Sequence, residues 1–433
     1  MKTYKILKKF GTQLPLRGLG GLSFLRGLGG FVFLFLFGMA GHSQTLEEYL
    51  QIASEQNPQV RASYAQFEAA MQRSPQVASL PDPTLAMSAF GRMMETRLGP
   101  QMARFTLMQM FPWFGTLQAR EDVATLMAEA AFQEYLDQRN QVFYEVRSVY
   151  AEIYALEKTI QVKEENLKIL DSYRELALSR FRSGSSPMVN VVRVDIQRDA
   201  AVTEIELLND RKRPLQTRFN LMLRRDVQDA IQVQDTLYIK DVPAIIDAEK
   251  LFENHPVITG LESQRLAYEA EQTVAQKEGL PMIGLGVDYN IIGKRTDANP
   301  DMNGQDAVMP MVSVTLPIFR KKINAAIKEA EFREESIREK QLAQLNDLQN
   351  EYQSALYEIN SSRKLLDLYD RQIESSGQAN SLLISGFSNS ITDFDEVLQM
   401  NQDVLMYQTQ RIEVLKNGLI AEAKLDYLLS KTD

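Results

Sequence analysis

The side chains of this chain that could do chemistry are mainly carboxylates. Its 433 residues include no cysteine and only two histidines, which excludes disulfides and thiolate metal sites and leaves little for imidazole catalysis. The sequence also contains no metal-binding triad, nucleophile motif or phosphate-binding loop. We therefore expect no metal site, no cofactor and no enzyme activity. The most informative acidic pair is Asp393 and Glu396, whose i, i+3 spacing places both carboxylates on one face of a helix.

Two functions fit this acidic pair. If several copies of the chain assemble about a symmetry axis, each carboxylate becomes a ring, and such a ring attracts cations and repels anions. Alternatively, residues 390–393 form a capping-box-like helix start, and acidic side chains in the first turn of a helix suit its macrodipole. The spacing alone leaves both interpretations open.

A second group of polar residues belongs to a strand-like stretch between residues 280 and 319. From Ile283 to Ile291, apolar residues alternate with glycine, Asp288 and Asn290, and a second alternation follows near residue 312. This period of two predicts a hairpin with one apolar and one polar face. Strands of a membrane barrel have such faces, and so do strands of a soluble sandwich. In a barrel, Asp288 and Asn290 would face the lumen.

The N-terminal segment predicts an exported protein, with a signal peptide over residues 1–43. Before Ser43 it contains six Lys or Arg, no acidic residue, an apolar run at 31–37 and then small residues. This order is typical of a secretory signal peptide, and the apolar run is too short to span a membrane. Cleavage would leave an acidic mature chain, so nucleic acid is not an expected partner.

The mature chain has mostly helical periodicity. Four elements are predicted first, namely a helix at 46–77, strands at about 84–90 and 103–111, and a long helix at 116–182. Apolar residues from Val142 to Ile160 follow a heptad seam on the long helix, which would measure about 100 Å at about 1.5 Å per residue. A return helix should follow, with Ser186 as N-cap and Pro187 at its first position.

The same order of elements then occurs a second time. We predict a first repeat at 44–225, a linker at 226–244 and a second repeat at 245–433, with strands at about 283–291 and 308–316 and a long helix at 321–383. Short motifs recur at matching places: Asn57-Pro58 with His255-Pro256, Leu80-Pro81 with Leu280-Pro281, Phe111-Pro112 with Leu316-Pro317, and Ser183-Gly184 with Ser385-Gly386. Recurrence at a fixed period indicates an internal duplication.

The number of strands constrains the assembly. Four strands cannot close a barrel, and an open sheet edge is not tolerated in lipid. If the hairpins span a membrane, several chains must therefore contribute strands to one barrel. Three chains would give twelve strands, a number within the known range of barrel sizes. The long helices would then pack side by side into a tube below the barrel.

These features resemble the outer-membrane efflux protein (TolC) family. The resemblance rests on the tandem order of elements, on residues 80–83 and 111–115 around the first hairpin, and on residues 391–397. Within the family, the Pro112-Trp113-Phe114-Gly115 segment is most similar to the heavy-metal efflux branch. The resemblance implies a mainly α fold with a small β part. As a homotrimer, it would form a twelve-stranded outer-membrane barrel continuous with a periplasmic α-helical barrel.

The resemblance also implies a function without catalysis. The chain would be a passive exit duct in the cell outer membrane, surrounded by outer-membrane lipid and extending into the periplasm. A periplasmic adaptor protein and an inner-membrane pump of the resistance-nodulation-division type would deliver its substrates, heavy-metal ions or small toxic compounds. The outer-membrane component of a type I protein or peptide secretion system is an alternative, since such ducts have the same walls.

Family resemblance assigns roles to particular residues. Asp393 and Glu396 fall where the family has carboxylates that constrict the periplasmic end of the tube. Asn190 takes the place of Asp393 in the first repeat, so the gate would differ between repeats. Four residues would form the tip that contacts the adaptor: Gly184, Pro187, Gly386 and Ser390.

Two other classes of protein share some of these features with the duct. A periplasmic coiled-coil adaptor would also be exported, acidic and helical. Such an adaptor should have one helical hairpin beside a lipoyl-like β domain, whereas the duplication here covers the whole mature chain. An exported helical enzyme would need a convergent polar site, which the sequence does not contain.

Overall fold

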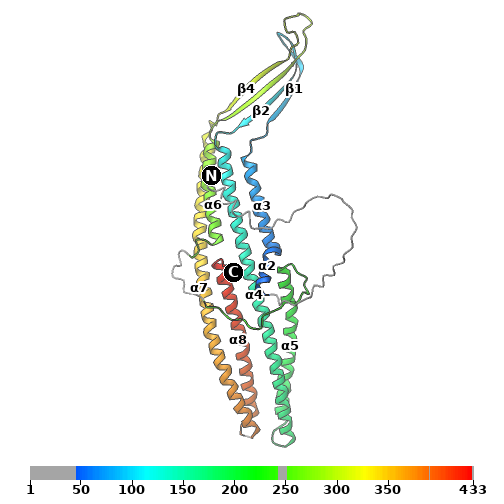
Figure 1. Cartoon of the computed structure of the whole chain (residues 1–433), viewed down its shortest axis with the longest axis vertical. Helices are drawn as coiled ribbons and strands as arrows, with labels where there is room; N and C mark the ends of the chain where they lie inside the picture. Colours follow the sequence, from blue (N-terminus) through cyan, green and yellow to red (C-terminus); the bar gives the residue numbers. More distant parts are fainter. Residues whose placement is uncertain (1–44, 242–250, 390, 432–433) are drawn as a thin grey trace, which may run out of the picture. The chain divides into compact units, whose positions relative to one another are not determined.

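The computed structural model describes residues 45–241, 251–389 and 391–431. The predicted signal peptide, Ser390 and the last part of the predicted linker lie outside these ranges. The described residues form helices and one four-stranded sheet (Figure 1). The prediction of a mainly α fold with a small β part is thereby confirmed.

Each half of the chain has the order helix, hairpin, long helix, return helix. The first half contains α2 (Leu46–Gln56), α3 (Pro58–Ala78), β1 (Thr84–Thr96), β2 (Gly99–Phe111), α4 (Thr116–Arg182) and α5 (Val189–Met222). The second half contains α6 (Pro256–Glu278), β3 (Met282–Ile292), β4 (Ala307–Thr315), α7 (Arg320–Ser388) and α8 (Phe394–Leu428). Helix α4 has 67 residues and α7 has 69.

None of the helices in the described ranges is both long enough and apolar enough to cross a membrane.

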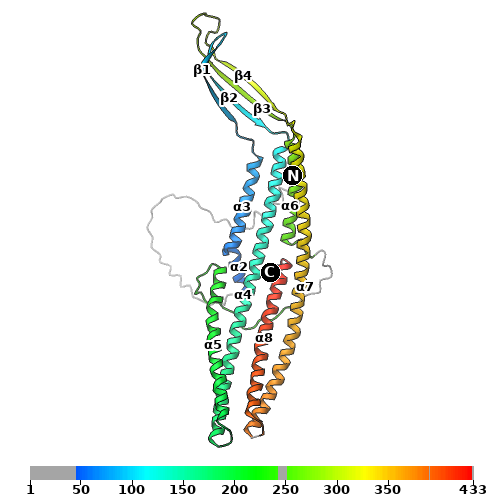
Figure 2. The ribbon, with the colours of Figure 1, turned by 180° about the vertical axis from the view of Figure 1, so that it is seen from behind.

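The helices are arranged in two stacked groups that share α4 and α7. Beside the sheet, neighbouring helices contact one another in the order α3, α4, α6, α7. Towards the opposite end, where two turns join α4 to α5 and α7 to α8, the order is α5, α4, α8, α7 (Figures 1 and 2). Helix α7 therefore forms one side of both groups, while α3 and α5 form the other.

The helix predicted over residues 46–77 is divided into α2 and α3 at Asn57. A residue before proline is disfavoured in the helical conformation, and Asn57 has ψ of 128°. Its Oδ1 accepts a hydrogen bond from Gln59 N at 2.8 Å, and its Nδ2 donates to Met222 O at 2.9 Å. Asn57 thus caps α3 and ties the start of that helix to the end of α5.

His255 has the same role at the start of α6. Its ψ is 132°, it precedes Pro256, and its Nδ1 accepts a hydrogen bond from Val257 N at 3.3 Å. The side chain is 2% exposed, and its Nε2 is buried without a hydrogen-bond partner among the described residues. Burial lowers the pKa of His255 to about 4, with Glu351 raising and Lys424 lowering it to a smaller extent. The imidazole is therefore neutral at physiological pH.

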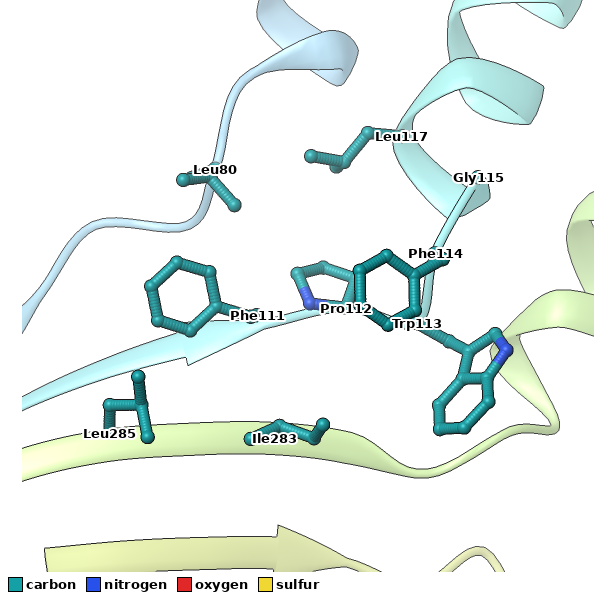
Figure 3. A pocket seen from close by; sticks show the side chains of 9 residues that line it. All are labelled: Leu80, Phe111, Pro112, Trp113, Phe114, Gly115, Leu117, Ile283 and Leu285. Carbon is teal, nitrogen blue, oxygen red and sulfur yellow. The ribbon is translucent and has the colours of Figure 1, made fainter.

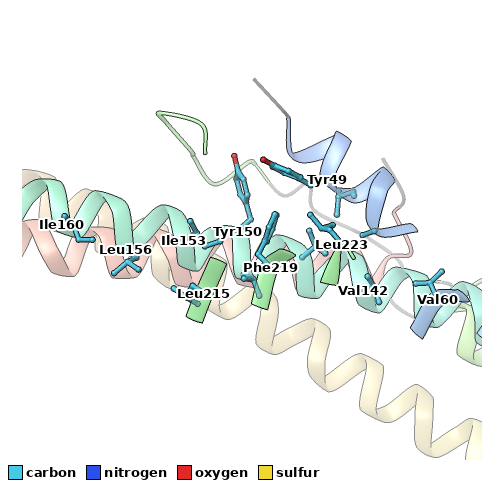
Figure 4. Packing of buried hydrophobic residues seen from close by; sticks show 14 residues of the cluster. Tyr49, Val60, Val142, Tyr150, Ile153, Leu156, Ile160, Leu215, Phe219 and Leu223 are labelled. Carbon is cyan, nitrogen blue, oxygen red and sulfur yellow. The ribbon is translucent and has the colours of Figure 1, made fainter. Parts of the chain in front are cut away.

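The seam predicted on the first long helix is the core of the first half. Side chains from Val142 to Ile160 are buried against α2 and α5, where Tyr49 and Phe219 meet edge to face with ring centroids 5.1 Å apart (Figure 4). In the second half, Tyr352 and Ile359 of α7 occupy a similar core. Buried apolar surface of this kind is the main stabilising contribution to a helical bundle.

The described part of the linker, residues 226–241, has no regular secondary structure but packs closely on the helices. Its backbone amides at Gln232 and Gln234 donate to the hydroxyls of Tyr49 and Tyr150, each at 3.0 Å. Ile239 lies so close to α8 that a Cβ at Gly418 would be 2.2 Å from its Cδ1. The linker therefore crosses the middle of the helices as an ordered strap.

The strands are antiparallel neighbours in the order β1-β2-β3-β4. The first hairpin is longer than predicted, because β1 extends to Thr96 and β2 begins at Gly99. A bulge between Ala89 and Met94 interrupts the pairing of β1 with β2. Because the bulge breaks the alternation of apolar and polar residues, the sequence predicts two shorter strands, at about 84–90 and 103–111.

Candidate functional site

The two faces of the sheet have the opposite exposure from that of a soluble protein. On one face Asp288 is 0% exposed, and Asn290 is also buried. On the other face Leu285 is 50% exposed and Val312 is 72% exposed. Folding in water buries apolar rather than polar side chains, so the apolar face of this sheet requires a non-aqueous environment.

Asp288 is held by side chains of the neighbouring strand. Arg104 forms a salt bridge to its Oδ2, and the Thr106 hydroxyl donates to its Oδ1. Beside this pair, Gln101 Nε2 donates to Asn290 Oδ1 at 2.7 Å. The carboxylate is therefore covered, and the charged group that this face presents is the Arg104 guanidinium, which remains part exposed.

The turn between α4 and α5 contains the first two predicted tip residues. Gly184 has φ of 72°, a conformation that favours glycine, and both Gly184 and Pro187 are exposed. Helix α5 begins at Val189 with Met188 as N-cap, so the N-cap predicted at Ser186 is wrong by two residues. The Ser186 hydroxyl instead accepts a hydrogen bond from Asn190 Nδ2 at 2.9 Å.

The turn between α7 and α8 differs from the first. Helix α7 continues to Ser388, so Gly386 lies in its last turn rather than in the connection. A Cβ at Gly386 would be 2.8 Å from Thr392 Cγ2, and the Thr392 hydroxyl donates to Leu383 O at 3.1 Å. Glycine is therefore needed there for close approach of the chain. The fourth predicted tip residue, Ser390, is outside the described residues.

Asp393 and Glu396 lie at the start of α8, both exposed. Asp393 is the N-cap residue, but its side chain makes no capping hydrogen bond. Among the described residues, neither carboxylate forms a hydrogen bond or a salt bridge. The capping box predicted from Ser390 lies in part outside the described residues, and both carboxylates are exposed at the surface of the chain.

The two helical turns are joined within one chain. A tip cluster of buried side chains links all four helices: Leu170, Tyr173 and Ala177 of α4, Val191 and Val194 of α5, Phe387 of α7, and Phe394, Val397 and Leu398 of α8. Arg193 on α5 forms a salt bridge to Asp395 on α8, and Arg180 on α4 donates to Ser388 O at 2.7 Å. Opening between the two hairpins would break these contacts.

An apolar notch lies where the sheet meets the helices, with a volume of about 410 Å³. Figure 3 shows Leu80 across the notch from Phe111 and Leu117, with Ile283 and Leu285 on the next strand. The segment from Pro112 to Gly115 forms one wall. Phe114 in this wall is 80% exposed and Leu80 is 47% exposed, so the notch leaves large apolar side chains uncovered in the single chain.

The sequence gives no direct signal for several side chains that form hydrogen bonds or salt bridges in these regions. Arg104 and Thr106 are two residues apart on β2, as Asp288 and Asn290 are on β3. The two pairs can be matched only when the register between β2 and β3 is known. The bridge from Arg193 to Asp395 has no sequence signal, because its residues are 202 positions apart. Within the described residues, no group of three His, Asp or Glu side chains is placed to hold a metal ion.

The chain matches the model of one protein family, described as outer membrane efflux protein, over residues 49–223 and again over residues 248–430. None of the curated protein sequences compared with the chain matches it.

Solved structures of outer-membrane channels share the fold. CusC is 15% identical, with a TM-score of 0.77, and the match covers 89% of this chain and 91% of that chain. The outer-membrane channel OprN is 17% identical, with a TM-score of 0.75 and 89% of each chain covered. VceC from Vibrio cholerae is 15% identical, with a TM-score of 0.73, covering 89% of this chain and 96% of that chain. At these identities the similarity concerns the fold alone.

Proposed function

The chain belongs to the outer membrane efflux protein family, and from this premise we propose that three copies form one continuous duct. Members of the family are outer-membrane channels of tripartite efflux systems, and this chain is such a channel. It is a passive conduit rather than an enzyme, placed in the cell outer membrane with a long helical extension into the periplasm.

The observation that carries the trimer is that one chain has two unpaired sheet edges with inverted faces. Strand β1 pairs only with β2, and β4 pairs only with β3. An edge strand exposes unpaired amide and carbonyl groups, which are costly in lipid. Pairing of β4 in one copy with β1 in the next satisfies both edges, and three copies close a barrel of twelve strands. Lipid then covers the apolar face, and Arg104 faces the lumen.

The helices support the same assembly. Two exposed apolar stripes lie at opposite sides of the chain, each with spacings that return to one helix face. On α5 the stripe consists of Val189, Val192, Ile196, Leu207 and Leu221, and on α7 of Phe332, Tyr357, Leu368 and Leu382. Packing of α7 in one copy against α3 and α5 of the next would bury both stripes and close a tube of helices.

The two helical turns form the periplasmic end of this tube. Three-fold symmetry would repeat Asp393 and Glu396 as rings at its mouth. The support for a gate is that both carboxylates are exposed and that Asp393 makes no capping hydrogen bond within the part of the chain that the structure describes. Gly184, Pro187, Gly386 and Ser390 are proposed to contact the adaptor. The adaptor and a pump of the resistance-nodulation-division type would supply the energy for transport.

For the cargo we propose heavy-metal ions or small toxic compounds. The support is the Pro112-Trp113-Phe114-Gly115 segment, which resembles the heavy-metal efflux branch. Deletion of the gene should sensitise cells to metal salts such as copper or zinc, and complementation should restore resistance. Sensitivity only to hydrophobic drugs would overturn the metal proposal without affecting the duct.

The trimer is tested by amine-reactive cross-linking of the chain in isolated outer membranes. We expect a trimer band that disappears in the Leu207→Asp variant, since a charge interrupts the α5 stripe. Asn209→Asp, an exposed residue off the stripe on the same helix, should leave the trimer intact. A soluble periplasmic monomer would overturn the proposal.

A further inference from the structure

Resting on the proposed trimer, we propose that the apolar notch is a socket for the neighbouring copy. Its occupant is the junction segment, Leu316 to Phe319, which connects β4 to α7. The notch then completes a joint between subunits at the base of the barrel, where lipid gives way to the periplasm.

The junction segment has the chemistry that the notch requires. Ile318 is 71% exposed and Phe319 is 82% exposed, and Leu316 is also exposed. Three of the four side chains of this segment are therefore large, apolar and mostly exposed in the single chain. The notch, lined on opposite sides by Leu80 and Phe114, is similarly apolar and open.

Two contacts of the proposed trimer would place the segment at the notch. Antiparallel pairing of β4 with β1 of the next copy would bring the end of β4 beside the start of β1, and Leu80 lies four residues before that start. Packing of α7 against α3 of the next copy would bring the first residue of α7, Arg320, beside the end of α3 at Ala78. Both contacts converge on the same junction.

The side chains also point to the same face. Directly paired residues of antiparallel strands share a face of the sheet, and the pairing of Leu285 with Val312 and of Ile283 with Val314 assigns β4 side chains to the notch face. Leu316 continues this alternation on the notch face. Beyond it the chain turns, since Ile318 N donates to Leu316 O at 3.0 Å and Arg320 N donates to Ile318 O at 3.1 Å. Ile318 remains 71% exposed in this turn and is the side chain expected to enter the socket.

Disulfide trapping tests the socket in a chain that has no cysteine of its own. The double variant Leu80→Cys with Ile318→Cys should form covalent dimers and trimers on oxidation, reversed by reductant. A disulfide within one copy is excluded, because three strand spacings of about 4.8 Å separate β1 from β4 and a disulfide needs Cα atoms within about 7 Å. Leu80→Cys with Val308→Cys, at the far end of β4, is the matched control and should not cross-link.

The outcomes distinguish failure of the socket proposal from failure of the trimer proposal. Amine cross-linked trimers without the Leu80–Ile318 disulfide would overturn the socket, with lipid as the remaining occupant, and leave the duct intact. No trimer by either method would overturn both. If the double variant does not reach the membrane, Asp82→Cys with Leu316→Cys provides the same test one step along the junction.

Discussion

Arg193 Nη1 on α5 lies 2.8 Å from Asp395 Oδ1 on α8, so one salt bridge spans the two helical hairpins at the periplasmic end. Both side chains are exposed, and a bridge of this type contributes about 0–1 kcal/mol. We expect Arg193→Glu to place like charges together and to raise the open fraction of the channel in planar bilayers, by up to about fivefold per bridge. The fold should remain intact, because the tip cluster still joins the helices.

A charge exchange provides the control for this bridge. Arg193→Asp combined with Asp395→Arg should restore the closed state that Arg193→Glu disturbs, since the attraction is rebuilt with its signs reversed. Equal open fractions in the single and double variants would mean that this bridge has no part in closure.

Removal of the free carboxylates at the start of α8 tests the gate. Asp393→Ala together with Glu396→Ala should raise single-channel conductance and lower selectivity for cations, because a negative ring and its side-chain bulk are lost. Glu374→Ala, an acidic residue on α7 away from the turn, is the control and should change neither quantity. If conductance and selectivity are unchanged in the double variant, Asp393 and Glu396 serve only the helix macrodipole.

Because Arg104 covers the Asp288 carboxylate, we expect substitution of Arg104 to change both the stability of the trimer and its ion selectivity. Arg104→Gln removes both the partner and the cover of the Asp288 carboxylate, so the salt bridge is lost and water of the lumen reaches Asp288. The trimer should dissociate at a lower temperature on gels, and cation selectivity should rise as Asp288 becomes uncovered.

The matched variant for this pair removes both charges. Arg104→Gln with Asp288→Asn should recover most of the lost stability, because the two amides can hydrogen-bond to each other and no unpaired charge remains. It should also return selectivity towards the parent value. A double variant as unstable as Arg104→Gln alone would show that the guanidinium acts through packing and not through the salt bridge.

Local rules were sufficient for much of this fold. The seam from Val142 to Ile160 predicted the buried face of α4, and the alternation from Ile283 to Ile291 predicted β3, because each pattern repeats with the period of its element. The first hairpin was predicted too short because the bulge after Ala89 breaks the alternation. The helix predicted over residues 46–77 is interrupted at Asn57, because a residue before proline disfavours the helical conformation.

Relations between distant residues were harder to predict. Asp288 and Asn290 were assigned to the polar face, and both lie on it, but the cover formed by Arg104 depends on the register between β2 and β3. Helix α7 extends five residues beyond the predicted end at residue 383, because Gly386 stays helical and leaves room for Thr392. The roles proposed for Asp393, Glu396 and the tip residues remain predictions.

We expect the protonation of His255 to lower the unfolding free energy of the chain in acid. Its pKa is lowered by burial to about 4, below the ordinary value of about 6.5. The unfolded chain therefore binds the proton first, so the stabilising difference is fully present above about pH 6.5 and declines as the pH falls towards 4. At pH 5 the expected loss is about 2 kcal/mol relative to pH 7.5.

Asn57 supplies the matched variant for this test, because it performs the same capping role without a titratable group. His255→Asn should retain the cap on α6 while the denaturant-induced unfolding free energy, followed by circular dichroism, falls less between pH 7.5 and 5 than in the parent. The difference should be about 2 kcal/mol, whereas the contribution of Asp137, whose pKa is raised by burial, is common to both chains and cancels. An identical pH dependence in the two proteins would mean that His255 does not remain neutral in the folded chain.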